Sequence, residues 1–145
     1  RQNKIPFIFD PGQAMPLYKS HELKNILKHS FGMTLNEYEL NLFKKLTGMS
    51  LKEILNICEL LIVTLGEKGS EIYFRGMRIP IKAIKPKKII DPTGCGDSFR
   101  AGFLSGIKNS FPKLTPSIVE KAGILGSCIA SKCLETKGTQ NHKFN

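Results

Sequence analysis

A continuous apolar run at positions 60–65, with the sequence LLIVTL, constrains the fold of this chain more than any other feature. A strand with one solvated face alternates apolar and polar residues, whereas a strand that is apolar throughout is buried on both faces. Such strands occur in parallel sheets whose two faces are covered by helices. Expected strands and helices alternate along the rest of the chain. The sequence therefore predicts an α/β fold with a mainly parallel sheet flanked by helices.

Turn residues and apolar periodicity predict the individual elements. Strands are expected over 5–9, 31–35, 60–65, 70–75 and 78–84, and the last two have the alternation of an antiparallel hairpin. Helices are expected over 20–29, 37–46, 51–58 and 116–134, with N-caps at Ser20, Asn36 and Ser50. At Ile89-Ile90 a further strand is expected to lead through a glycine turn into one more helix.

The two expected C-terminal helices differ in their faces. The first has one apolar stripe, made of Phe99, Phe103, Leu104 and Ile107. The second has apolar residues at helical spacing, namely Ile118, Ala122, Leu125, Ile129 and Cys133. Its other face is small and consists of Gly123, Gly126, Ser127 and Ala130. A small face allows either another backbone or a flat ligand to come close.

Length, composition and cysteine content are those of one globular domain. The chain has 145 residues, of which 41% are hydrophobic, and no run reaches the roughly 18 apolar residues of a membrane-spanning helix. The four cysteines, Cys58, Cys95, Cys128 and Cys133, lack the spacing of zinc ligands. We expect them to be reduced thiols of a cytoplasmic protein.

The formal charge of +10 has two explanations. A nucleic-acid-binding surface usually interleaves aromatic residues with its basic cluster. The densest basic run, Lys82–Lys88, contains no aromatic residue and adjoins a strand. We therefore favour a solvated, lysine-rich surface, with neither a nucleic-acid nor a membrane partner, over nucleic-acid binding.

The stretch at 89–103, IIDPTGCGDSFRAGF, is the one most indicative of chemistry. The glycines around Cys95 allow backbone N–H groups to point in one direction before a helix begins, and such a helix start binds anions. Asp97 in the first helical turn could accept a proton beside a bound phosphate, which favours phosphoryl transfer. An ordinary acidic residue at a helix N-terminus explains Asp97 equally well. The stretch lacks the third glycine of a dinucleotide-binding motif, and the chain contains no Walker A motif.

Several motifs together resemble those of one enzyme family. DPTGCGD at 91–97 is similar to the D-T-x-G-A-G-D signature of the ribokinase/PfkB family of sugar and nucleoside kinases. Residues 36–39, NEYE, resemble the family's N-x-x-E motif, and VTLGEKG at 63–69 resembles its nucleotide-binding strand and turn. KGTQ at 137–140 is similar, more weakly, to the family's closing G-A-q. The resemblance implies the Rossmann-like ribokinase fold over nearly the whole chain.

The resemblance also implies roles for single residues. Asp97 is implied as the catalytic base, and the N–H groups of Gly94, Cys95 and Gly96 as the anion hole. The implied contacts to ATP and its Mg²⁺ come from Thr64, Gly66, Gly69, Asn36 and Glu39, with Glu39 reaching the metal through water. Gly126, Ala130 and Gly138 are implied to border the adenine. Asp91 and Thr93 match positions that bind a monovalent cation such as K⁺ in some members.

Each of these implied roles has a structural alternative. Asn36 with Glu39 is equally a helix cap followed by a solvated glutamate, and the glycines at 66 and 69 suit an ordinary hairpin turn. The small face around Gly126 is explained by tight helix packing.

The chain also departs from the family pattern. Cys95 replaces an alanine, which should be harmless because the backbone N–H is the functional group. Pro92 replaces a threonine and removes an N–H. Arg100 stands where many sugar kinases have an uncharged residue. It could reach the phosphate pocket or simply be solvated, and we favour the phosphate side of the site.

The activity implied by the resemblance is transfer of the ATP γ-phosphate to a hydroxymethyl group of a sugar or nucleoside. The family's N-terminal half and its β lid have no counterpart in residues 1–145, so we expect the C-terminal, nucleotide-binding and catalytic portion of such a kinase. The alternative is a catalytically incompetent fragment that binds nucleotide or anion only. The expected partner is a small-molecule substrate, with a homodimer as a further expectation for a full-length protein.

Overall fold

The computed structural model describes residues 5–139 and 141. The strands are β1 (Ile8–Phe9), β2 (Gly32–Asn36), β3 (Leu60–Thr64), β4 (Ser70–Phe74) and β5 (Met77–Ile81). The α-helices are α1 (Ser20–His29), α2 (Glu37–Thr47), α3 (Leu51–Ile57), α4 (Cys95–Ile107) and α5 (Pro116–Leu134), and two 3₁₀ helices are η1 (Gly12–Leu17) and η2 (Gly66–Lys68). The strands form one sheet in the order β1-β2-β3-β4-β5. β1, β2 and β3 are parallel, which confirms the α/β class.

The chain divides into two compact units. The first comprises the residues up to 65 together with 71–78, and the second comprises 66–70 together with the residues from 79 onward. Within the part of the chain that is described, no helix is long and apolar enough to cross a membrane.

The core of the first unit lies between helices and the parallel strands. Its buried members come from η1, α1, β2, α2, α3 and β3 and are Met15, Leu23, Leu27, Met33, Leu35, Phe43, Ile54, Cys58, Leu61 and Val63. The close approach of β2 to β3 depends on Gly32, because a Cβ there would lie 2.5 Å from the Leu60 carbonyl oxygen. Residues 60–63 are buried, as the apolar run predicts for a strand covered on both faces.

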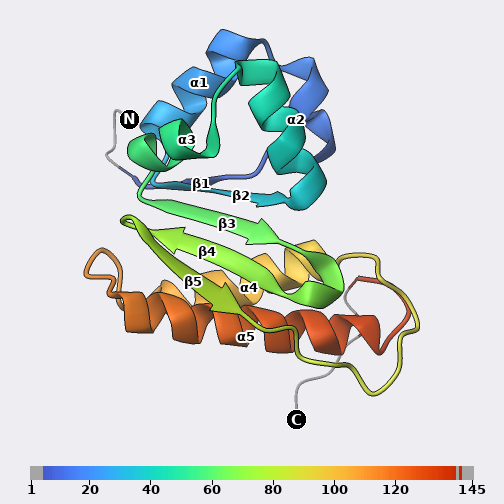
Figure 1. Ribbon diagram of the computed structural model, residues 1–145. Coiled ribbons are helices and arrows are strands. Elements are labelled where there is room, and N and C mark those ends of the chain that lie inside the picture. The colour runs from blue at the N-terminus through green and yellow to red at the C-terminus, as the bar shows by residue number, and fades with distance from the viewer. Residues whose placement is uncertain (1–4, 140, 142–145) are drawn as a thin grey trace. The chain divides into compact units, whose positions relative to one another are not determined.

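The hairpin between β4 and β5 is confirmed, and Figure 1 shows the two strands running in opposite directions. Its turn has positive φ at both central residues, 47° at Arg75 and 82° at Gly76, as a type I′ turn requires. Two contacts hold Arg75 in this unfavourable conformation. Its Nε donates to Glu59 Oε2 at 2.9 Å, and its guanidinium lies 4.9 Å from the centre of the Phe74 ring.

In the second unit α4 lies alongside α5 (Figure 1). The contact is made by small residues, because a Cβ at Gly102 would lie 2.8 Å from Gly126 Cα, and one at Gly106 would lie 2.8 Å from Ala122 Cα. The small face of α5 is thus buried by helix packing. The expected apolar stripes are only partly buried: Leu104 and Leu125 are 47% and 38% exposed.

Most expected elements agree with the structure, and α5 has the expected bounds. The expected strand at Ile89-Ile90 is wrong, because the structure has no strand there and Ile89 is 73% exposed. The Ile90 N–H donates to the Leu134 carbonyl at 2.8 Å rather than to a neighbouring strand. The N-cap of α1 is Lys19 rather than Ser20, with Glu22 Oε2 accepting the Lys19 N–H at 2.6 Å.

Candidate functional site

The turn before α4 has a conformation that selects glycine. Gly94 is the N-cap of α4 and has φ 82°, in the left-handed region that residues with a side chain rarely adopt. A Cβ at this position would lie 2.8 Å from Thr139 Cγ2. Two independent constraints, the backbone conformation and the close approach of Thr139, therefore require glycine at position 94.

The C-terminal half of α5 holds the loop that leads into this turn. Besides the Ile90–Leu134 bond, the Cys133 thiol contacts the Thr93 carbonyl at 3.4 Å. The Cys95 thiol contacts the Ala130 carbonyl at 3.9 Å, which is a weak interaction. These contacts come from one face of a long helix. α5 therefore holds the glycine turn in place through residues that lie 35 and 40 positions later in the sequence.

The N–H groups at the start of α4 form the candidate anion site. The first helical bond runs from Ser98 N–H to the Gly94 carbonyl at 2.9 Å. The Cys95 N–H donates to the Pro92 carbonyl at 3.3 Å, a long and therefore weak bond. No described residue accepts a hydrogen bond from the Gly96 N–H. A helix start with such weakly engaged donors and a positive dipole end stabilises an anion.

Asp97 stands in the first turn of α4, and its side chain is 72% exposed. It forms an ion pair with Arg100 one turn later, through Nη2 of the arginine and Oδ1 of the carboxylate. The Arg100 side chain is less exposed, at 33%, and its partial burial lowers its pKa, although an arginine side chain remains charged. The sequence-based expectation for Arg100 did not include this pair, although the i,i+3 spacing permits it.

Asp91 joins the glycine turn to the segment after α5. Its Oδ1 accepts the Thr93 N–H at 2.9 Å, and its Oδ2 accepts the Gly138 N–H at 2.9 Å. Hydrogen bonds from the Thr93 side chain and from the backbone of Gly138 and Thr93 lower the pKa of Asp91 to about 2. These bonds explain Asp91 without a cation, and the monovalent-cation role of Asp91 and Thr93 stays a prediction.

The lowered pKa of Asp91 predicts a loss of stability in acid. A carboxyl group whose pKa falls from 3.8 to about 2 on folding stabilises the folded state above pH ~4, and this contribution disappears as the pH falls toward 2. We expect Asp91→Asn to remove that part of the pH dependence and to loosen the loop at all pH values. Thermal unfolding of both proteins between pH 2 and 6 measures this. Parallel curves for the two proteins would contradict the assigned bonds.

The thiol of Cys95 is in surroundings that disfavour its thiolate form. Burial, followed by the neighbouring Cys133, raises the pKa of Cys95 to about 11, so the reactive thiolate is scarce at neutral pH. We expect Cys95→Ala to change turnover and nucleotide affinity by less than about threefold, because it removes only a weak contact to Ala130 and keeps the backbone N–H. Steady-state kinetics of this variant would contradict that expectation if the rate fell more than tenfold.

In the first unit, Asn36 and Thr64 are Cα partners at the ends of the parallel strands β2 and β3. Asn36 caps α2: its Oδ1 accepts the Glu39 N–H at 2.8 Å, and Glu39 Oε2 accepts the Asn36 N–H at 2.8 Å. The cap at Asn36 agrees with the structural alternative, but Glu39 takes part in the cap instead of being a merely solvated residue. The cap occupies one carboxylate oxygen of Glu39, which is half-buried, whereas Asn36 is exposed.

A magnesium site built around Glu39 fits this arrangement. The described residues contain no group of three or more His, Cys, Asp or Glu side chains that could hold a metal. Mg²⁺ does not need such a group, because it usually keeps several waters and binds one or two carboxylates together with substrate phosphates. The metal role of Glu39 remains a prediction.

Gly66 begins η2 and Gly69 follows it, and the Gly69 N–H donates to the Gly66 carbonyl at 3.0 Å. Gly69 has φ 97°, and a Cβ there would lie 2.1 Å from the Ile81 carbonyl oxygen. The turn therefore requires glycine for packing reasons alone. The next residue was missed by sequence reasoning: Ser70 is 3% exposed, and its Oγ is buried without a hydrogen-bond partner among the described residues. A small polar residue at the start of a strand gives no indication in the sequence that its hydroxyl group will be buried without a hydrogen-bond partner.

The two candidate adenine-contacting residues on α5 differ in surroundings. Gly126 is buried, and a Cβ there would lie 2.8 Å from the Phe99 carbonyl oxygen. This is the tight helix packing weighed as an alternative. Ala130 is half-buried, and its carbonyl contacts Cys95. Proximity to adenine stays a prediction for Gly126, Ala130 and Gly138, and Gln140 of the closing motif lies outside the described residues.

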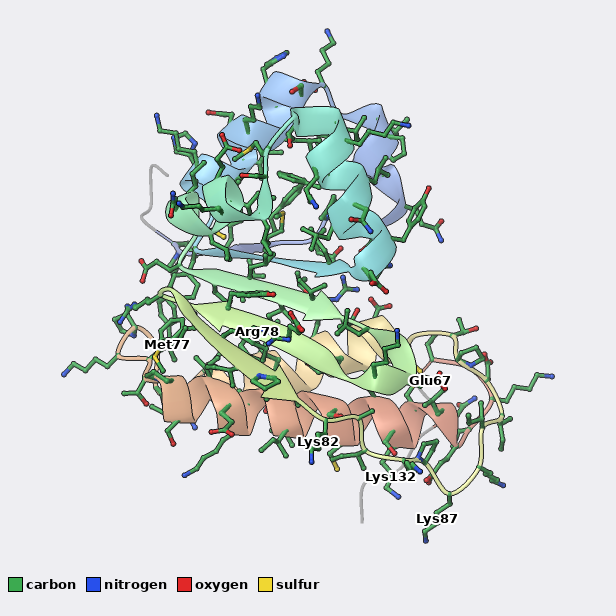
Figure 2. The ribbon with its side chains drawn as sticks, viewed as in Figure 1. Glu67, Met77, Arg78, Lys82, Lys87 and Lys132 are labelled. Atoms are coloured by element: carbon green, nitrogen blue, oxygen red, sulfur yellow. The ribbon has the colours of Figure 1, made fainter. Side chains whose placement is uncertain are left out.

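The lysines of the 82–88 run are exposed. Figure 2 shows Lys82, Lys87 and Lys132 with their amino groups directed away from the ribbon. Backbone atoms of the run are hydrogen-bonded: the Lys82 carbonyl accepts from Ser127 Oγ at 3.1 Å, and the Lys87 N–H donates to Glu135 Oε1 at 2.7 Å. A solvated lysine surface agrees with this geometry.

Comparison with known proteins places the chain in a family. Residues 1–144 match the model of the pfkB family of carbohydrate kinases. This chain belongs to that family. The family resemblance drawn from the motifs at 36–39, 63–69 and 91–97 is thereby confirmed.

Relatives of this PfkB chain include a nucleoside kinase from Methanocaldococcus jannaschii, which is 40% identical over 92% of the chain. Its crystal structure, described as an archaeal member of the ribokinase family, superposes with a TM-score of 0.86. A nucleoside kinase from Burkholderia thailandensis in complex with inosine superposes with a TM-score of 0.90, at 37% identity over 97% of the chain. The chain spans 42% of the length of the M. jannaschii relative and 45% of the B. thailandensis chain.

Proposed function

We propose that the protein containing this chain is an ATP-dependent kinase that phosphorylates a hydroxymethyl group of a nucleoside or sugar. The helix start at Gly94–Asp97 carries the proposal. It combines weakly engaged backbone donors with an exposed carboxylate in the first helical turn. A carboxylate beside an anion site is electrostatically costly unless it accepts a proton, and phosphoryl transfer to a hydroxyl releases one.

Residues at the start of α4 have two roles in the chemical step, proton acceptance and stabilisation of negative charge. The oxygen of the acceptor hydroxyl attacks the γ-phosphorus, and its proton passes to the carboxylate of Asp97. The bond from the γ-phosphorus to the bridging oxygen breaks, and ADP leaves. The N–H groups of Gly94, Cys95 and Gly96 stabilise the negative charge on the transferred group.

The remaining predicted residues position ATP. Thr64 is the last residue of β3, and Gly66 and Gly69 belong to the turn that follows it. Glycines in such a turn allow backbone groups to approach phosphates closely. Asn36 and Glu39 would hold Mg²⁺, which supplies neutralisation of phosphate charge when it is bound.

A nucleoside is the favoured acceptor. The relatives from M. jannaschii and Thermoplasma acidophilum, 40% and 33% identical, are both nucleoside kinases, and the B. thailandensis enzyme binds inosine. A coupled assay of ADP release with adenosine, inosine, ribose and fructose tests the proposal. Turnover with a nucleoside supports it, and turnover with none of the four by the complete protein that the gene encodes would overturn it.

The second candidate function is nucleotide or anion binding without catalysis. It is favoured by one observation, that the chain spans less than half the length of these relatives. Positioning of both substrates supplies much of the rate in phosphoryl transfer, and a partial site cannot position them. Calorimetric binding of ATP by residues 1–145 together with absent turnover of all four acceptors would favour this candidate. Turnover by residues 1–145 alone would refute it.

A further inference from the structure

We propose that Arg100 is a positioning residue that holds the carboxylate of Asp97 in the orientation needed to accept the proton. The inference rests on the proposed function, because it concerns the same carboxylate. It differs from the sequence-based expectation that Arg100 lies on the phosphate side. The ion pair between Arg100 Nη2 and Asp97 Oδ1 is the observation that carries it.

The two partners differ in mobility for a structural reason. Asp97 is 72% exposed, so packing restricts its side chain little. Arg100 is 33% exposed, so surrounding atoms restrict its side chain more than that of Asp97. The less exposed partner therefore restrains the more exposed one.

The geometry of the pair also suits a proton acceptor. Arg100 contacts Oδ1, one of the two carboxylate oxygens. This contact restrains the carboxylate through Oδ1, so that Oδ2 can face the acceptor hydroxyl. Arginine keeps its own proton, so Arg100 stays a cation and a hydrogen-bond donor to the carboxylate of Asp97.

The pair has little to do with folding. An exposed ion pair at i,i+3 spacing contributes little to the stability of a helix. α4 is held by Phe99, Phe103 and Ile107, which are buried, and by its contact with α5. A variant that removes the guanidinium but keeps an unbranched side chain should therefore fold.

The test is Arg100→Met in the complete protein that the gene encodes. Loss of positioning should lower kcat roughly 10- to 100-fold, since a small displacement of a catalytic group costs that much, while the KM for ATP stays within about threefold. Arg100→Lys should recover much of kcat, because a single charged contact to Oδ1 is within reach of an ammonium group. Lys108→Met, an exposed cation at the end of the same helix, is the matched control and should leave both constants unchanged.

A double-variant cycle with Asp97→Asn distinguishes a role of Arg100 through Asp97 from a direct role at the phosphate. If Arg100 acts through Asp97, adding Arg100→Met to Asp97→Asn lowers the rate no further. A further loss in the double variant, or a rise in the KM for ATP with unchanged kcat, would instead assign Arg100 to the phosphate and overturn the inference. Unchanged kcat in Arg100→Met alone would overturn it too, while the proposed function stands if Asp97→Asn is inactive. Full activity of Asp97→Asn would reject the role of Asp97 as the base, and with it this inference, whereas the proposed kinase activity is tested separately by turnover of the four acceptors.

Discussion

Replacing Asp97 by Asn should lower kcat by roughly 100- to 10,000-fold, the contribution of a well-placed general base. Asparagine has nearly the same shape but cannot accept the proton of the attacking hydroxyl. The exposed position of Asp97 in the first turn of α4 makes a folding defect improbable as the cause of the loss. The affinity for ATP should change by no more than a few-fold, because the anion site is formed by backbone N–H groups that the substitution leaves in place.

Two experiments on the Asp97→Asn variant test this expectation. Single-turnover kinetics with a saturating nucleoside give the rate of the chemical step, and calorimetric titration gives the dissociation constant for ATP. Glu120→Gln, an exposed carboxylate on α5, serves as the control and should behave as the unaltered protein. Undiminished turnover of Asp97→Asn would show that another group takes the proton.

Replacing Gly126 by Val should destabilise the protein by roughly 2–3 kcal/mol, the usual cost of inserting methyl groups into a packed interior. The new Cβ would lie 2.8 Å from the Phe99 carbonyl oxygen and 3.2 Å from carbon atoms of the Phe99 ring. The nearest neighbour is backbone, which cannot move aside without separating α4 from α5. For a chain of this length the melting temperature should fall by roughly 5–10 °C.

Thermal unfolding followed by circular dichroism tests this expectation. Lys121→Val is the matched control, because position 121 is exposed on the same helix and the substitution carries the same cost of a β-branched residue. If Gly126→Val melted within about 1 °C of the control, the two helices could not approach each other as closely as described. A loss of activity in Gly126→Val at temperatures below its melting point would point instead to the predicted adenine contact.

The sequence by itself determined the features that depend on neighbours a few residues apart. The N-caps at Asn36 and Ser50, the bounds of α5 and the glycine turn before α4 all follow from hydrogen bonds within one helical turn or from local backbone conformation. The family was recognisable for the same reason, because its motifs are short and contiguous. The acidic residue in the first turn of α4 was visible in the sequence, although its role as a base remains a proposal.

Only the tertiary structure decided which faces are buried and which distant groups meet. Apolar content suggested that Leu125 would be buried, but α4 packs on the small residues of α5, because two helix backbones approach most closely where side chains are shortest. Ile89 and Ile90 have the composition of a strand, yet Ile90 donates to the end of α5. The bond from Gly138 to Asp91 joins residues 47 positions apart. No local pattern encodes such a contact, since it exists only after the chain has folded.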